Sequence, residues 1–563
     1  MFDFLTLGRR IPQDPLANLK AVTLWMKELP LGDVYAAHDK IVRGLVEFNE
    51  AEKPLTRERL QVLMHIDETA REMQQSLCQQ YLLNPRMSKG AESRLWNAVH
   101  AYYWEVTRGY HAFIMDYVAN PGGSKIKTLV PLITARAIHD FAHIFKWRYF
   151  RYEKVEEKAW KRLHNLYHFA EFEEFECERM PLYAGDSGQS SCADGYLHAL
   201  MLDTLNSGGL YPKQIELVSV WLEGWTHMLQ LDKVYDPARH AFFVNLGQSG
   251  GGRRIRKGAG DEMCRYWGSA GLTERLLEIK SSLHDGSAPA QLGLSEDCKL
   301  PGCLDLLEHV LAQWAPVVKR VRRKHERSRV MKMIEVVNGL SEICVQLKHD
   351  NEPARKKHSF DDGELSYEEM VDVRLYGFVT ERTLNKLASK ADKAAPVAHY
   401  ERWAMENESE RGYGATVAEV SNDWVRLGKL VGMKPERTRH WRVGVVRRLH
   451  KLSSSQRHVG IELLAETAVT VLLHPNKQNQ SSGYLVDGID PVDVTLPVAA
   501  IYLPRDLGAG EHGSLVMDGS EYAMGRLFKL TASGKSYTIR LKDVVEKGSD
   551  WLRAGFEVLS KSV

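Results

Sequence analysis

The chain has 563 residues, of which 44% are hydrophobic and 26% are charged, and its formal net charge is +2. This length exceeds what one hydrophobic core supports, so we expect about two to four domains. The near balance of charge argues against a protein that coats nucleic acid over its whole surface. The seven cysteines include no Cys-x-x-Cys pair. A disulfide framework is therefore not expected, and a reducing cytoplasm fits best.

The first ten residues place their two arginines after a short apolar run, which is the wrong order for a secretory signal. No segment reaches the run of about 18 apolar residues that a membrane-spanning helix needs. We therefore predict a cytoplasmic protein without direct membrane insertion.

Residues 1–350 are predicted to form an α-helical array that serves as a docking or output module. Between Leu60 and Tyr81, apolar residues recur at the spacing of one helix face. Glycine and proline residues separate this segment from further amphipathic ones. These further stripes occupy residues 95–117, 127–150, 156–176, 213–231 and 303–319.

Two groups of residues in this part have a spacing that metal sites use. His164, His168 and Glu171 would share one helix face, but the apolar residues among them favour a helix core with structural histidines. Cys298 and Cys303 resemble half of a zinc site, and no second pair with matching spacing follows. We predict no metal at either place.

Two basic segments are candidate sites for phosphate or nucleic acid. The loop 247–257 combines glycines with arginines but lacks the ending of a P-loop, so we interpret it as a solvated loop. The run 319–329 has seven basic residues and one acid. On a helix it would form a basic face for RNA or an acidic partner, although a solvated helix end is favoured.

After residue 350 the pattern changes. Residues 351–395 read as a charged linker that bears arginines, and short β-type runs follow from about residue 396. The polar stretch Pro475–Ser482 divides these runs into two predicted β domains, 396–475 and 484–563. The expected fold class is α+β, with a long α-helical array followed by one or two small antiparallel β-barrels.

The first β run contains an Asn-x-Ser-x-x-Gly turn at Asn407, Ser409 and Gly412. Two predicted strands follow, Trp441–Arg448 and Val459–Leu463. This order resembles the PilZ family, small β-barrels that bind the bacterial second messenger cyclic di-GMP. The resemblance implies that Asn407 and Ser409 hold the turn, while Gly412 permits positive φ and close approach of the ligand.

In the PilZ family this turn works with an upstream Arg-x-x-x-Arg clamp, whose guanidinium forks match phosphate and guanine O6/N7. No such motif lies just before residue 403. The nearest arginines are Arg374 and Arg382, eight residues apart, while Arg323 and Arg327 form a true Arg-x-x-x-Arg farther upstream. The sequence does not choose between these pairs. The candidate ligand-binding residues are Arg374, Arg382, Arg402, Asn407, Ser409, Gly412 and Arg447.

The resemblance implies a cyclic di-GMP receptor that needs no cofactor and relays the messenger level to a protein partner. Large helical proteins that end in such a barrel are similar to receptors of the FimW kind, which are linked to surface attachment and type IV pili. Two alternatives stay open: a helical interaction scaffold with a ligand-free barrel, and an RNA-binding protein that uses residues 319–329. An enzyme is disfavoured because no nucleophile–base or carboxylate pair stands out.

Overall fold

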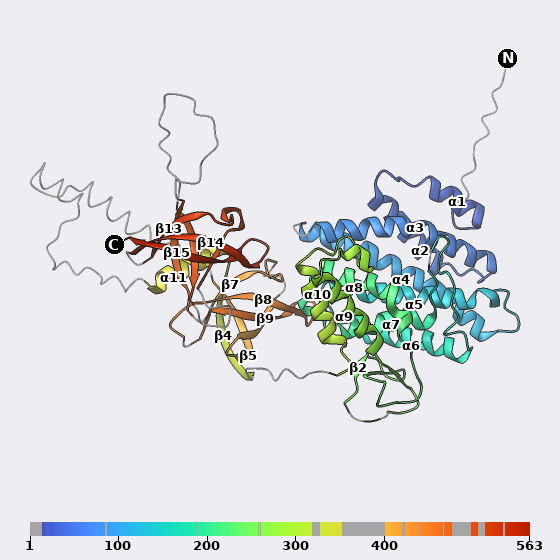
Figure 1. Ribbon diagram of the computed structural model, residues 1–563. Coiled ribbons are helices and arrows are strands. Elements are labelled where there is room, and N and C mark those ends of the chain that lie inside the picture. Colours follow the sequence, from blue (N-terminus) through green and yellow to red (C-terminus); the bar gives the residue numbers. More distant parts are fainter. Residues whose placement is uncertain are drawn as a thin grey trace, which may run out of the picture. The chain divides into compact units, whose positions relative to one another are not determined.

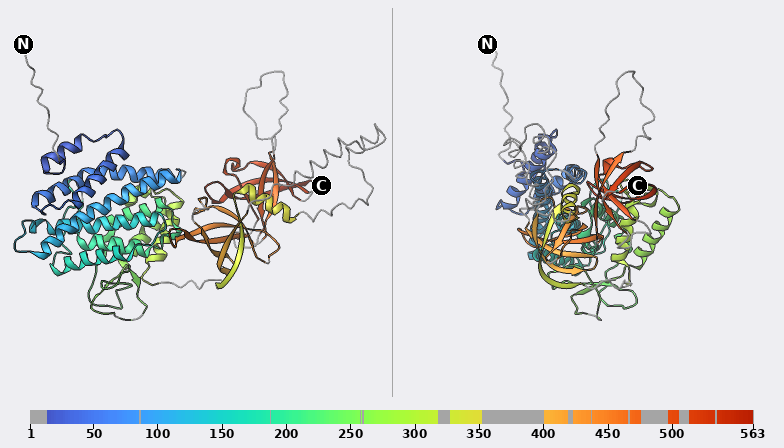
Figure 2. Two further views of the ribbon diagram at one scale, coloured as in Figure 1. Left: turned by 180° about the vertical axis from the view of Figure 1, so that it is seen from behind. Right: turned by 90° about the vertical axis from the view of Figure 1, so that its left-hand side faces the viewer.

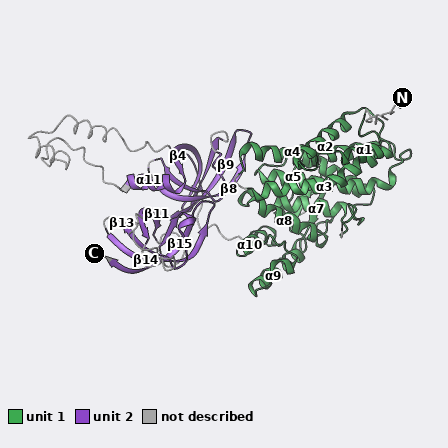
Figure 3. Ribbon diagram, turned by 90° about the horizontal axis from the view of Figure 1, so that it is seen from above, with its two compact units in different colours: residues 1–321 green, residues 322–563 purple. Residues whose placement is uncertain are grey.

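The computed structural model describes residues 14–84, 87–186, 188–256, 258, 260–317, 327–351, 400–418, 423–436, 438–465, 467–475, 497–504, 513–532 and 535–562. The chain divides into two compact units, residues 1–321 and residues 322–563 (Figure 3). The first unit is mainly helical, and the second contains two closed six-stranded antiparallel barrels. The predicted fold class is therefore confirmed.

Long helices of the first unit lie side by side, and each of the predicted amphipathic stripes contains a helix over most of its length (Figures 1 and 2). Several begin at a side chain that accepts a backbone N–H of the first turn, as Thr56 and Ser88 do for α3 and α4. The bounds are α1 (Leu19–Lys27), α2 (Val34–Glu50), α3 (Arg57–Leu83), α4 (Lys89–Ala119), α5 (Val130–Phe150), α6 (Glu157–Phe172), α7 (Cys192–Thr204), α8 (Pro212–Trp225), α9 (Ala270–His284) and α10 (Gly302–Trp314).

Helix α5 lies at the centre of this unit and contacts α4, α6, α7 and α8. Because it is surrounded, nearly every one of its side chains is buried, polar ones included. Arg136, for example, is 2% exposed and binds Glu68 Oε1 at 2.6 Å. The sequence pattern predicted this helix but not how many charged groups it carries into the core.

A small sheet that the sequence pattern did not predict interrupts the helices, in the order β2-β1-β3. Its strands are β1 (Phe242–Asn245), β2 (Arg253–Arg254) and β3 (Cys264–Trp267). Farther along, Cys298 and Cys303, the pair that resembled half of a zinc site, form a disulfide with each other.

The first barrel has the strand order β4-β5-β6-β9-β8-β7. Its strands are β4 (Ser328–Asn338), β5 (Glu401–Ser409), β6 (Gly412–Ala418), β7 (Leu430–Pro435), β8 (Arg442–Lys451) and β9 (Gln456–Ala465). Strand β4 and the helix after it, α11 (Leu340–Asn351), precede the predicted domain start at 396. The boundary between the units therefore lies near 321, not at 350, and the predicted linker 351–395 falls inside the barrel's sequence.

The second barrel has the strand order β10-β11-β12-β15-β14-β13. Its strands are β10 (Val469–Pro475), β11 (Val498–Leu503), β12 (Ser514–Met517), β13 (Leu527–Ala532), β14 (Lys535–Lys547) and β15 (Leu552–Ser562). Because β10 belongs here, the barrels meet between Ala465 and Val469. The predicted division at Pro475–Ser482 instead falls inside the second barrel's sequence.

The two barrels share a buried seam. Helix α11 packs on strands of both, with Ile343 and Leu347 in one apolar cluster with Ile501 of the second barrel. The buried Trp551 donates its indole N–H to the Gly428 carbonyl at 2.8 Å. The second unit therefore has a continuous core across its two barrels.

Candidate functional site

A hollow of about 690 Å³ lies at one end of the first barrel, where β4 begins and β5 ends. This volume falls within the range of roughly 300–1,000 Å³ that small-molecule sites occupy. Its lining combines two guanidinium groups, one carboxylate, one amide and two apolar side chains: Arg327, Arg329, Val330, Met331, Glu406 and Asn407.

Strand pairing creates this arrangement. Strands β4 and β5 are antiparallel, and Arg329 lies directly opposite Asn407. The register of β4 slips between Arg329 and Lys332, and that of β5 slips between Met405 and Asn407. Such bulges leave residues outside the regular ladder and redirect their side chains. The hollow lies at these two irregularities.

The Asn-x-Ser-x-x-Gly turn has a clear role in holding Asn407. Ser409 donates its hydroxyl to the Gly412 carbonyl at 3.2 Å, which closes the β5–β6 hairpin. A Cβ atom on Gly414 would lie 2.3 Å from Asn407 Nδ2, so the amide packs directly on that glycine. The hairpin thus presents Asn407 to the hollow.

Gly412 has a different role from the predicted one. It does not adopt positive φ. A Cβ atom there would lie 2.1 Å from the Ile461 carbonyl oxygen of β9. The residue is glycine because two backbones approach closely, and not because the turn is left-handed.

Positive charge gathers around this rim. Burial lowers the pKa of His458, Glu406 opposes that effect, and the Arg327 and Arg448 guanidinium groups lower the pKa further. His458 Nε2 lies 3.8 Å from Glu406 Oε2. Arg327 just before β4, Arg448 of β8 and the Glu406 carboxylate of β5 therefore all lie near His458 of β9. Within the described residues, neither Arg327 nor Arg329 forms an ion pair with a carboxylate.

Two predicted ligand-binding arginines do not line the hollow. Arg402 lies toward the other end of β5, with Nη2 3.7 Å from Glu335 Oε1. Arg447 binds Glu462 at 2.7 Å and Glu546 of the second barrel at 2.6 Å, on a strand that β6 and β9 separate from β5. Arg374 and Arg382 lie outside the described residues.

Sequence reasoning missed Arg329 and weighed Arg327 only as half of a distant motif. The strand that begins near Arg329 could have been predicted from its alternation. Buried Ile334 and Val336 alternate with the more exposed Met333 and Glu335, which is typical of a strand. The basic run 319–329 was interpreted as a helix end. Its last two residues, Ser328 and Arg329, instead begin strand β4.

The other segments that the sequence offered as metal or phosphate sites have structural roles. His164 contacts the Gly250 carbonyl at 2.9 Å and the Tyr196 hydroxyl at 2.7 Å, while Glu171 binds Arg265 through both carboxylate oxygens. In the loop 247–256 several residues are exposed, as expected for a solvated loop, but its centre packs on the helices, because a Cβ atom on Gly251 would lie 2.0 Å from an Asp203 oxygen. The hollow beside it, about 10 Å³, is too small for a phosphate group.

None of the helices within the described residues is both long enough and apolar enough to cross a membrane.

Comparison with known proteins identifies relatives of both units. Residues 20–237 match the family described as cyclic-di-GMP receptor FimW, N-terminal domain, and residues 348–469 match cyclic-di-GMP receptor FimW, middle PilZ domain. The chain is also 22% identical over 524 residues to the cyclic-di-GMP receptor FimW of Pseudomonas aeruginosa strain PAO1, covering 85% of this chain and 84% of that protein. No solved structure matches the chain.

Proposed function

Because the chain belongs to the FimW family of PilZ-domain proteins, we propose that it is a cytoplasmic receptor that binds cyclic di-GMP at the rim of its first barrel. The single observation that carries the location of the site is the pairing of Arg329 with Asn407. This pairing brings the basic segment before β4 to the Asn-x-Ser-x-x-Gly hairpin.

The chemistry of the rim suits the ligand. Cyclic di-GMP carries two singly charged phosphodiesters and two guanines with acceptor-rich edges. Guanidinium groups donate paired hydrogen bonds to both and stack on bases. Arg327 and Arg329 provide such groups beside the hollow, and Val330 and Met331 provide apolar surface. The proposed function therefore requires binding and no catalysis.

The Arg-x-x-x-Arg at Arg323 and Arg327 supports the proposal more than the pair Arg374 and Arg382 does. Arg327 directly precedes strand β4 of the barrel and lines the hollow. In PilZ proteins the clamp precedes the barrel in the same manner. Arg323, Arg374 and Arg382 lie outside the described residues, so their part in binding stays a prediction.

Isothermal titration of the full chain with cyclic di-GMP tests the proposal. Arg327→Ala and Arg329→Ala should each weaken binding about 10- to 100-fold, because a hydrogen bond to a charged group contributes about 1.5–3 kcal/mol. Arg540→Ala is the matched control, since that exposed arginine pairs with Glu557 on the second barrel. GMP and cyclic di-AMP should bind much more weakly than cyclic di-GMP.

The outcome separates the alternatives. No binding at about 100 μM ligand would favour a helical scaffold with a ligand-free barrel. If only Arg402→Ala or Arg447→Ala weakened binding, the site would lie away from the rim. Affinity for RNA that falls steeply with salt would favour nucleic-acid binding through residues 319–329.

We further propose that the bound receptor relays the messenger level to a protein partner in surface attachment or type IV pilus function. Support for this step is the similarity of residues 20–237 to the N-terminal domain of FimW. Cells that carry Arg327→Ala in place of the wild-type protein should attach as poorly as cells that lack it. Normal attachment by that variant, with lost ligand binding, would contradict the relay.

A further inference from the structure

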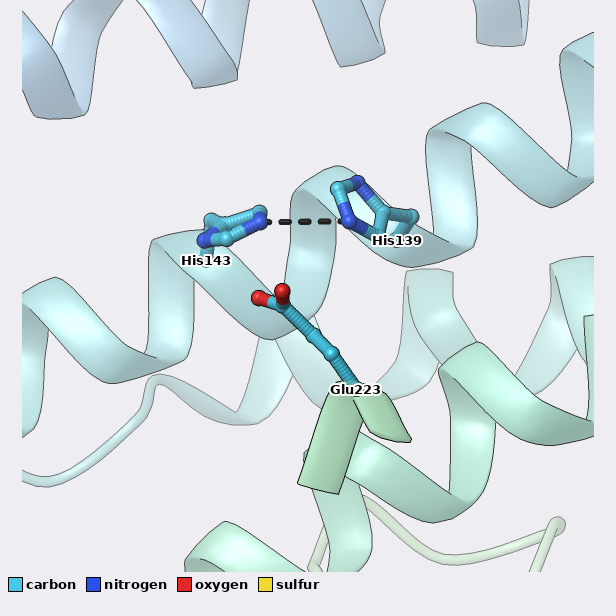
Figure 4. Close-up of side chains that lie close together, drawn as sticks. All are labelled: His139, His143 and Glu223. Atoms are coloured by element: carbon cyan, nitrogen blue, oxygen red, sulfur yellow. Dashed lines mark hydrogen bonds between the residues drawn. The ribbon is translucent and has the colours of Figure 1, made fainter. Parts of the chain in front are cut away.

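The helical unit contains a cluster of two imidazoles and one carboxylate that the proposed receptor function does not use. His139 and His143 are one turn apart on α5, and Glu223 lies on α8 (Figure 4). One potential ligand atom from each residue lies within 4.8 Å of the others. In Figure 4 the carboxylate of Glu223 points toward the space between the two rings.

The position of this cluster follows from the packing of the two helices. His139, His143 and Lys146 form one stripe on α5, and Glu216 and Glu223 form one stripe on α8, two turns apart. Lys146 Nζ binds Glu216 Oε2 at 2.9 Å. Glu216 is therefore the direct partner of Lys146, while Glu223 lies near both Lys146 and His139.

The distance between the rings matches a shared metal ion. His139 Nε2 and His143 Nε2 are 3.3 Å apart. In a tetrahedral zinc site, two nitrogens that each lie about 2.05 Å from the ion are separated by about 3.3 Å. The two nitrogens thus have the separation that coordination requires, and the Glu223 carboxylate lies within 4.8 Å of both.

The surroundings of the rings also suit a metal. His139 Nδ1 faces Asp140 Oδ1 at 3.8 Å, the side on which metal-bound histidines hold a carboxylate. The Nδ1 atoms of both rings and Asp140 Oδ2 have no hydrogen-bond partner among the described residues.

We propose that His139, His143 and Glu223 bind one divalent transition-metal ion of the Zn²⁺ class and thereby join α5 to α8. Two histidines with one glutamate are a known zinc ligand set, and they leave a fourth position for water or a small ligand. His139 is half-buried and Glu223 exposed, so this fourth position faces solvent and not the core.

Zinc binding by the tag-free full chain, after removal of metal with a chelator, tests the proposal. We expect one Zn²⁺ per chain by titration, and one Co²⁺ with the strong visible absorption of a tetrahedral site. His139→Ala and Glu223→Gln should each weaken binding at least about 100-fold, since even outer partners of metal ligands contribute about 10- to 100-fold. Mg²⁺ should not compete, because imidazole suits it poorly.

The chain has 22 histidines, so binding alone is not sufficient support. His168→Ala is the matched control, because His168 is an exposed histidine on the neighbouring helix α6 and should leave zinc affinity unchanged. Zn²⁺ should also raise the melting temperature of the wild type but not that of Glu223→Gln, whose exposed side chain is dispensable for folding. Absence of stoichiometric binding, or wild-type affinity in both ligand variants, would overturn the proposal.

Discussion

Gly414→Ala would displace Asn407 from the rim of the first barrel while leaving both strands paired. The new Cβ atom would lie 2.3 Å from Asn407 Nδ2 and 2.7 Å from Oδ1, against a normal contact of about 3.5 Å. The amide must therefore move by about 1 Å. Because it ends a rotatable side chain, the expected loss in free energy of unfolding is about 1–2 kcal/mol. Cyclic di-GMP affinity should fall about tenfold, the value of one hydrogen bond.

Gly412→Ala gives the contrasting result on the same strand. Its Cβ atom would lie 2.1 Å from the Ile461 carbonyl oxygen, and this backbone atom cannot move without displacing strand β9. We expect a loss of about 3 kcal/mol or more in free energy of unfolding. Urea unfolding followed by circular dichroism measures both variants, and isothermal titration measures ligand binding.

A double-mutant cycle isolates the cause. Asn407→Ala removes the group that Gly414→Ala would strike, so the second substitution should cost little stability in that background. The double variant should bind cyclic di-GMP no more weakly than Asn407→Ala alone. Equal destabilisation by Gly414→Ala in both backgrounds, or wild-type affinity in the single variant, would refute the assigned role of Asn407.

Three further predictions concern stability. Burial raises the pKa of Asp67 from 3.8 to about 7. The contribution of Asp67 to stability is therefore complete below pH 3.8 and is lost as the pH rises through 7. Relative to Asp67→Asn, the wild type should lose stability over this pH window, as measured by urea unfolding. Glu171→Ala leaves Arg265 buried without its partner and should cost about 3–5 kcal/mol, measured likewise, whereas a surface pair would cost under about 1 kcal/mol. Trp551→Ala should cost about 3–5 kcal/mol and uncouple the melting of the two barrels by calorimetry; a single unchanged transition would contradict the shared seam.

Much of the architecture could be read from local patterns. The helical stripes, the change to β runs and the turn at Asn407, Ser409 and Gly412 depend on residues near one another in the sequence. The hairpin that the turn was expected to form is present, with Ser409 opposite Gly412. The spacing of hydrophobic residues and the residue types of a turn are local properties of the sequence, and they predict local structure well.

The membership of each barrel could not be read in this way. Strand β4 pairs with β5 although residues 339–400 separate them, and β10 follows β9 closely but joins the other barrel. Domain limits drawn from composition therefore fell at 350 and 475, within the sequences of the two barrels. Strand pairing is decided by which backbone edges meet after folding, and composition does not encode it.

The same distinction governs the two sites. The amino-acid pattern was enough to predict a hairpin, several arginines near it and the family that this arrangement resembles. Which arginines lie at the rim became clear only from the folded chain, in which Arg327 and Arg329 lie beside Asn407 while two glutamates hold Arg447 elsewhere. Folding also brought Glu223 of α8 to His139 and His143 of α5. Side chains from distant segments become neighbours through packing and strand register, which depend on the whole fold.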